Sequence, residues 1–110
     1  MIRVEAVVTR ERVETVIDAV EEEVGHLGVT ITEATGYGHH DRFSEQVLLT
    51  LIVPENEAKR VAEAISAAAR TGNESGDGLV WLSPVYHVRH IRTGKPLHEY
   101  VEVGVKVGAA

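Results

Sequence analysis

The chain has 110 residues, a formal net charge of −6 at pH 7 and no cysteine. This length fits one domain, and an apolar content of 44% is too high for an intrinsically disordered chain. The absence of cysteine excludes disulfides and thiolate metal sites, while the acidic balance argues against a general nucleic-acid-binding protein. Because only 5% of the residues are aromatic, the core must be aliphatic.

The amino-terminal segment predicts a strand followed by a helix. Residues 2–8 alternate apolar and charged side chains, which is the period of a strand with one buried face. Thr9 stands where a helix cap would stand. Along residues 13–24 valine and isoleucine recur at steps of three and four, which predicts an amphipathic helix that ends near Gly25. No signal peptide or membrane-spanning run is visible, so we expect a cytoplasmic protein without membrane insertion.

The next part of the chain predicts two strands joined by a polar loop. Val29 and Ile31 alternate with two threonines, which predicts a strand that ends at Gly36-Tyr37-Gly38. Residues 39–45 are polar and have no regular period, as in a loop. Residues 47–53 are almost continuously apolar, which is typical of a central strand covered on both sides.

The carboxyl-terminal half predicts a second helix and further strands. Pro54 opens a helix whose alanines, valine and isoleucine share one face as far as Ala69. Residues 71–78 are rich in glycine and form a loop, and residues 79–82 form a fourth strand. Residues 86–92 extend that strand or form a short ribbon, and valines alternate cleanly near the carboxyl terminus.

The resulting order, β-α-β-β-α-β, predicts the α+β ferredoxin-like fold, with an antiparallel sheet and both helices on one face. We expect a single domain over residues 1–110, with its core at residues 2–95 and a carboxyl-terminal strand at residues 97–107. The second face of such a small sheet also needs cover, which predicts an oligomer.

Two segments carry the chemistry. Thr71-Gly72-Asn73-Glu74-Ser75-Gly76-Asp77-Gly78 could present successive backbone N–H groups to an anion, or it could only connect a helix to a strand. Residues 86–95 hold Arg89, Arg92 and Lys95 without an acidic residue. Arginine donors match phosphate oxygens, although these cations could equally pair with the acidic helix faces.

The order of these motifs resembles the PII-type signal-transduction family. The resemblance rests on Gly36-Tyr37-Gly38, on the glycine loop ending in Gly76-Asp77-Gly78, and on His90-Ile91-Arg92-Thr93-Gly94. It covers roughly residues 2–95 and agrees with the predicted order of strands and helices.

This resemblance implies a homotrimer that binds adenine nucleotides in clefts between subunits, without a tightly bound cofactor, and that controls a target transporter or enzyme. Gly76, Asp77 and Gly78 would cradle phosphates, with Arg92 and His90 nearby. The nucleotide-binding residues that it implies are Gly28, Thr30, Gly36, Gly38, Ile52, Gly76, Asp77, Gly78, Arg89, His90 and Arg92.

Departures from the family pattern modify that expectation. Leu79 replaces a lysine and His90 replaces an arginine, although Arg89 is adjacent. Fewer fixed cations weaken triphosphate binding most, so ADP, AMP or cyclic AMP should be favoured over ATP. The loop after Gly38 is short and residues 39–45 contain no tyrosine, which favours a target in carbon or ion uptake, such as a transporter.

Two other functions compete with this hypothesis. Adjacent His39 and His40 could bind a metal in a trimer of the copper-tolerance type. An enzyme is not expected, because no Ser/His/Asp order, paired carboxylates or phosphate-loop lysine is visible.

Overall fold

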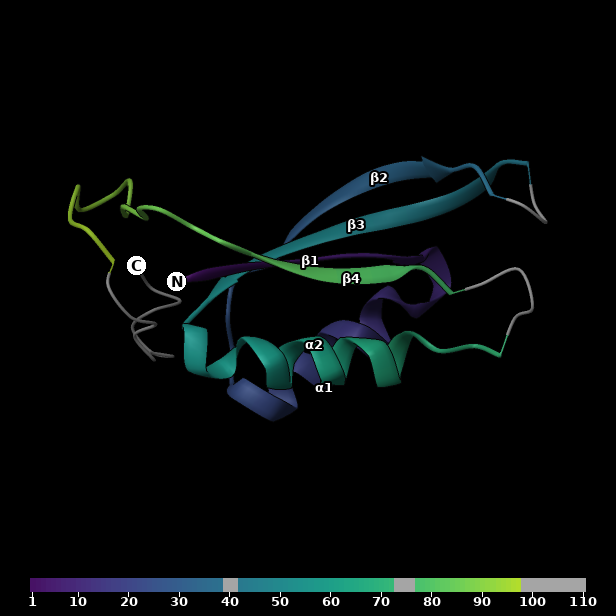
Figure 1. Cartoon of the computed structure of the whole chain (residues 1–110), viewed down its shortest axis with the longest axis horizontal. Helices are drawn as coiled ribbons and strands as arrows, with labels where there is room; N and C mark the ends of the chain where they lie inside the picture. Colours follow the sequence, from purple (N-terminus) through teal and green to yellow (C-terminus); the bar gives the residue numbers. More distant parts are fainter. Residues whose placement is uncertain (39–41, 73–76, 98–110) are drawn as a thin grey trace.

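The computed structural model describes residues 1–38, 42–72 and 77–97. Within these residues, two helices and four strands follow one another in the predicted order (Figure 1). Their bounds are β1 (Ile2–Thr9), α1 (Val13–Val24), β2 (Thr30–Gly36), β3 (Ser44–Val53), α2 (Glu55–Ala69) and β4 (Leu79–Pro84). The ferredoxin-like α+β fold predicted from the sequence is therefore confirmed. The predicted carboxyl-terminal strand, at residues 97–107, lies almost entirely outside the described residues.

The four strands form one antiparallel sheet in the order β2-β3-β1-β4. β1 lies at the centre, where Val4 pairs with Leu51 of β3 on one side and with Leu82 of β4 on the other. β2 and β4 are the sheet edges. Both helices cover the same face of this sheet (Figure 1). The alternation along β1 produces this arrangement, because every second side chain points toward the helices.

The core between sheet and helices is aliphatic, as the composition requires. Among the described residues, every buried hydrophobic side chain is Ala, Val, Leu or Ile. The largest fully buried ones are Val4, Val8, Val16, Val20, Leu49, Val53, Val61 and Ile65. They come from both helices and both central strands, so one contiguous core holds all the elements that carry the site.

The junction between β1 and α1 differs from the expected helix cap. A three-residue 3₁₀ turn, Arg10–Arg12, separates the strand from α1, and Thr9 makes no side-chain capping hydrogen bond. Instead Arg12 reaches across to the last turn of α2. Its Nε and Nη2 both donate to the carbonyl oxygen of Ala68, at 3.0 and 2.7 Å. This contact satisfies a helix-end carbonyl that has no partner within the helix.

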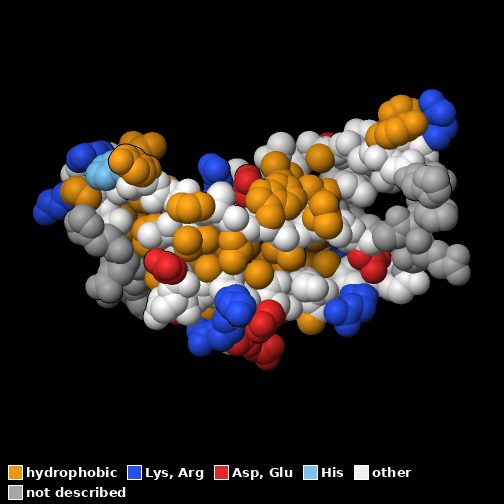
Figure 2. Space-filling model, in the orientation of Figure 1, with side chains coloured by type: hydrophobic (Ala, Val, Ile, Leu, Met, Phe, Trp, Pro, Cys, Tyr) orange, Lys and Arg blue, Asp and Glu red, His pale blue; other side chains and the backbone are white. Residues whose placement is uncertain are grey.

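Neither of the two helices in the described residues lies over the second face of the sheet (Figure 1). On β3, Val47 and Leu49 are buried against the helices, whereas Leu48 is only half-buried. Glu5 lies at the centre of the open face, where its carboxylate accepts hydrogen bonds from Trp81 Nε1 (3.1 Å) and Thr50 Oγ1 (3.2 Å). Hydrophobic side chains gather over β4 and along the seam between β4 and α2 (Figure 2). The cover expected on both sides of β3 is thus supplied on one side within a single copy.

Candidate functional site

The described ends of the glycine loop are tied together by Asp77. Oδ2 of Asp77 accepts hydrogen bonds from the backbone N–H groups of Thr71 (3.0 Å) and Gly72 (3.4 Å). Oδ1 of the same carboxylate accepts a hydrogen bond from the Thr71 hydroxyl. The side chain of Asp77 therefore occupies donors at the start of the loop, immediately after α2 and Arg70.

The end of the loop is fixed by close contact with the sheet. Gly78 has φ +104°, and a Cβ atom placed on it would lie 1.8 Å from the carbonyl oxygen of Val7. Only glycine fits this position, because other residues bring both a disfavoured backbone conformation and a collision with backbone. Leu79, the next residue, pairs with Val7 at the start of β4.

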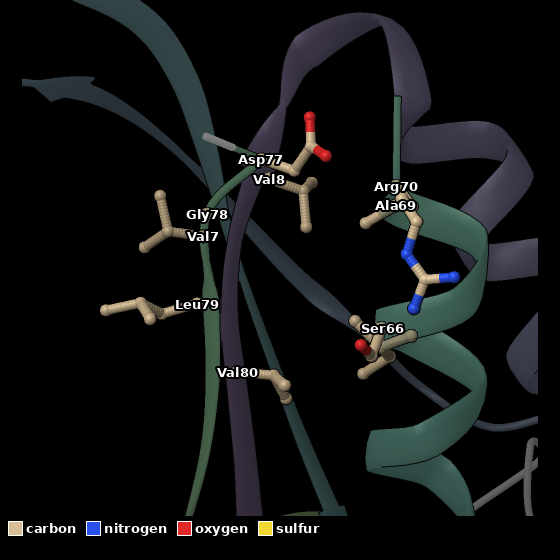
Figure 3. Close-up of a pocket in the computed structure, with 10 residues that line it drawn as sticks. Val7, Val8, Ser66, Ala69, Arg70, Asp77, Gly78, Leu79 and Val80 are labelled. Atoms are coloured by element: carbon tan, nitrogen blue, oxygen red, sulfur yellow. The ribbon is translucent and has the colours of Figure 1, made fainter. Parts of the chain in front are cut away.

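A hollow of about 120 Å³ lies between α2 and the strands β1 and β4, beside Asp77. In Figure 3, Val8 and Val80 point toward α2, and Arg70 extends along the helix toward Ser66. Apart from its valine, leucine, isoleucine, alanine and glycine residues, the lining of the hollow contains the hydroxyl of Ser66, the guanidinium of Arg70 and the carboxylate of Asp77. Ligand pockets usually measure about 300–1,000 Å³, so this hollow cannot hold a nucleotide by itself.

The residues proposed from β2 and β3 lie near the opposite edge of the sheet. Thr30 pairs with Thr50, two residues before Ile52, and is exposed. Gly28 precedes Thr30 by two residues and is also exposed. Gly36 ends β2, where a Cβ atom would meet the side-chain amide of Gln46 at 2.8 Å.

The basic segment forms a short hairpin, one of the two structures that the sequence allowed. Arg89 bridges Pro96, and Leu97 N donates to Val88 O at 2.8 Å. His90 accepts a hydrogen bond on its carbonyl from Gly94 N, also at 2.8 Å. The Arg89 guanidinium donates to Gly94 O at 2.5 Å, so this cation stabilises the turn.

The structure places the proposed residues in separate regions of one copy. Asp77 and Gly78 precede β4, and Arg89, His90 and Arg92 follow it, so these two groups lie at opposite ends of the molecule (Figure 1). The six residues of β4 alone span about 20 Å. Gly36 and Gly38 lie toward the same end of the sheet as Asp77, but on the β2 edge.

Three of the residues named from the sequence, Gly76, His39 and His40, lie outside the described residues. Within residues 1–38, 42–72 and 77–97, no three His, Asp or Glu side chains are grouped as a metal site would require. In the same part of the chain, none of the helices has the length and apolar character needed to cross a membrane.

Sequence reasoning missed the residues that shape the loop. Thr71 and Gly72 count there only as part of a glycine-rich run, although a Thr-Gly helix end followed by an aspartate is a signal for side-chain turn chemistry. The contact between Arg12 and Ala68 joins residues 56 positions apart, and no local pattern predicts it.

Comparison with known protein families identifies the family of this chain. The family model described as Nitrogen regulatory protein P-II matches residues 1–95. The chain belongs to the P-II family. It is therefore a signal-transduction protein, and the resemblance read from the glycine loop and the hairpin is confirmed.

Individual P-II proteins are similar over most of their length. The Nitrogen regulatory protein P-II of Azospirillum brasilense is 32% identical, with 86% of this chain and 95% of that protein covered. The corresponding protein of Nostoc punctiforme is 34% identical over 70% of this chain and 80% of its own length. Nitrogen regulatory protein P-II 1 of Methanothermobacter thermautotrophicus is 33% identical over 86% and 92%.

The alignments also show that this P-II chain is shorter within the matched region. The match to the Azospirillum brasilense protein runs over 108 positions, whereas 86% of 110 residues is about 95. Roughly 13 aligned positions therefore have no residue of this chain opposite them. The connection between β2 and β3 here consists only of residues 37–43.

Proposed function

We propose that this P-II protein is a homotrimeric regulator that binds an adenine nucleotide between subunits and controls a target protein. One observation supports the placement of the site: the glycine loop and the basic hairpin lie at opposite ends of the same copy. No single copy brings both to one ligand. Two neighbouring copies, each contributing one end, would complete the cleft, and the uncovered sheet face offers a surface for their association.

In this cleft the backbone around Gly76, Asp77 and Gly78 donates N–H groups to phosphate oxygens. Arg92 and His90 approach from the neighbouring copy, and arginine supplies charge-assisted hydrogen bonds to phosphate. Arg89 holds the hairpin in shape through Gly94 O, which positions its neighbours.

The base and ribose require a different part of the sheet. Thr30 and Ile52 belong to paired strands, and Gly28 lies close before Thr30. In the proposed cleft the threonine hydroxyl contacts the adenine edge and the isoleucine packs on its face. Gly36 and Gly38 line the cleft where a side chain would obstruct the ligand.

The ligand preference follows from charge. Leu79 is 74% exposed at the phosphate end of the loop, where it offers no cation. A triphosphate loses most from a missing cation, because it carries the most charge. The proposal is therefore that ADP, AMP or cyclic AMP binds in preference to ATP, without turnover of the nucleotide.

The proposed target follows from the short loop. A connection of only residues 37–43 between β2 and β3 offers a small contact surface, and it needs little ordering on binding. This favours a target such as a transporter in carbon or ion uptake, contacted from the cytoplasm. The relatives carry the name of nitrogen regulation, so a nitrogen-regulated target is the alternative outcome.

Calorimetry and thermal unfolding with ATP, ADP, AMP and cyclic AMP test the proposal. A ligand at a hundredfold excess over its Kd stabilises the folded protein by about 2.7 kcal/mol. The Arg92→Ala variant should lose that stabilisation while native mass spectrometry still shows trimers. Arg60→Ala removes a cation that pairs with Glu23 and Glu57 on the helices, and serves as the control. Absence of stabilisation by all four nucleotides in the wild type would refute the proposed function.

A further inference from the structure

We infer that the side chain of Asp77 is a positioning group that holds the glycine loop in its binding shape and is not a contact of the nucleotide. This inference rests on the proposed function for its ligand, but its geometric basis is independent. Asp77 accepts hydrogen bonds from Thr71 N, the Thr71 hydroxyl and Gly72 N. We call these three residues the Asp77 clasp.

In the clasp, the carboxylate of Asp77 is itself the anion that the N–H groups of Thr71 and Gly72 bind. Backbone N–H groups that converge on one point are the donors that bind phosphate in other loops. Here the donors of Thr71 and Gly72 already face a carboxylate, and a hydrogen bond to an ionised acceptor is stronger than a neutral one. A nucleotide phosphate therefore does not use these two donors.

The segments before and after the loop are each held by contacts of their own. Before the loop, the two hydrogen bonds from Arg12 to Ala68 O hold the end of α2. After the loop, Gly78 is pressed against the backbone of Val7. The Asp77 clasp links these two described ends of the loop to each other.

Removal of the Asp77 carboxylate should change the nucleotide affinity in opposite directions, depending on whether the carboxylate only lies near the phosphates or holds the loop together. A carboxylate that merely lies near bound phosphates repels them, so its removal should tighten nucleotide binding. A carboxylate that holds the loop together has the opposite effect, because its removal leaves the donors disordered. The same substitution thus separates the two roles.

The experiment compares Asp77→Ala, Asp77→Asn and Thr71→Val with the wild type, using ADP titration calorimetry. Asp77→Ala should weaken ADP binding roughly tenfold, as expected for one lost charge-assisted contact. Asp77→Asn should fall between Asp77→Ala and the wild type, since its amide oxygen still accepts from both N–H groups. Thr71→Val should weaken ADP binding although it leaves the charge in place. Thr71→Ser keeps the hydroxyl and should bind ADP like the wild type. Asp18→Asn, on the exposed face of α1, removes an equal charge as the control.

Amide hydrogen exchange without nucleotide provides the second readout. Thr71 and Gly72 should be protected in the wild type and exchange at least ~10-fold faster in Asp77→Ala, while Leu49 in the core remains protected. Tighter or unchanged ADP binding by Asp77→Ala, or unaltered exchange at Thr71 and Gly72, overturns the inference. If the wild type binds no nucleotide, the proposed function fails, and the exchange rates alone decide whether the clasp exists.

Discussion

The contact between Gly78 and Val7 makes a quantitative prediction about stability. In the Gly78→Ala variant the added Cβ would lie 1.8 Å from the Val7 carbonyl oxygen, at φ +104°. The backbone conformation alone costs about 1–3 kcal/mol for a residue with a side chain. Because the obstacle is backbone, β4 must also move away from β1, which weakens ladder hydrogen bonds of about 1 kcal/mol each. We expect a loss of about 3–4 kcal/mol from a total stability of about 5–15 kcal/mol.

Two other glycines separate the contributions to that loss. Gly72 has φ +81°, but a methyl group added there would meet nothing within 4 Å, so Gly72→Ala adds backbone strain without a collision. Gly28 has open space and no positive φ, so Gly28→Ala should be nearly neutral. Urea unfolding followed by circular dichroism, at one protein concentration for all variants, measures the three differences. The reasoning is refuted if Gly78→Ala is no less stable than Gly72→Ala.

Three further substitutions test separate contacts. Arg12→Met should lower the free energy of unfolding by about 1.5–3 kcal/mol, because it removes the charged donor to Ala68 O; urea unfolding measures this. Trp81→Phe should cost about 1 kcal/mol in the same assay, because it keeps an aromatic ring but removes the N–H that donates to Glu5. Leu79→Lys should improve ATP binding more than AMP binding in calorimetry, since it restores a cation at the phosphate end.

Each of these variants has a control and a contrary result. Within the described part of the chain, Arg10 makes exposed ion pairs with Glu33 and Glu45, so Arg10→Met should cost less than about 1 kcal/mol. An equal cost for Arg10→Met and Arg12→Met would contradict the special role of Arg12. A Trp81→Phe variant as stable as the wild type would show that the Glu5 contact contributes nothing. Equal gains for ATP and AMP in Leu79→Lys would show that the residue does not face the terminal phosphates.

The fold could be predicted because each element has a local periodicity that agrees with its neighbours. The alternation over residues 2–8 predicts a strand and the three-and-four spacing over residues 13–24 predicts a helix, each from neighbouring residues alone. The order of elements then left few topologies. The 3₁₀ turn Arg10–Arg12 was not predicted, and no local pattern indicates that Arg12 binds the distant carbonyl of Ala68.

The candidate site was less accessible from sequence, for a physical reason. The motifs indicate which residues share a ligand chemistry, but not how far apart the chain carries them. The sequence assigns Gly78 to the ligand because glycine allows close approach, and the structure adds a packing reason that sequence alone does not contain. It likewise assigns Arg89 to the ligand, whereas the guanidinium of Arg89 binds Gly94 O within the hairpin.

These observations give β4 a mechanical role in the proposed regulator. Gly78 anchors one end of the strand against β1, and the hairpin of Arg89 and Pro96 begins shortly after its other end. The six residues of β4, which alone span about 20 Å, thus separate the backbone proposed to bind phosphate from the basic side chains. In the proposed trimer, each copy would therefore contribute one end to each of two clefts.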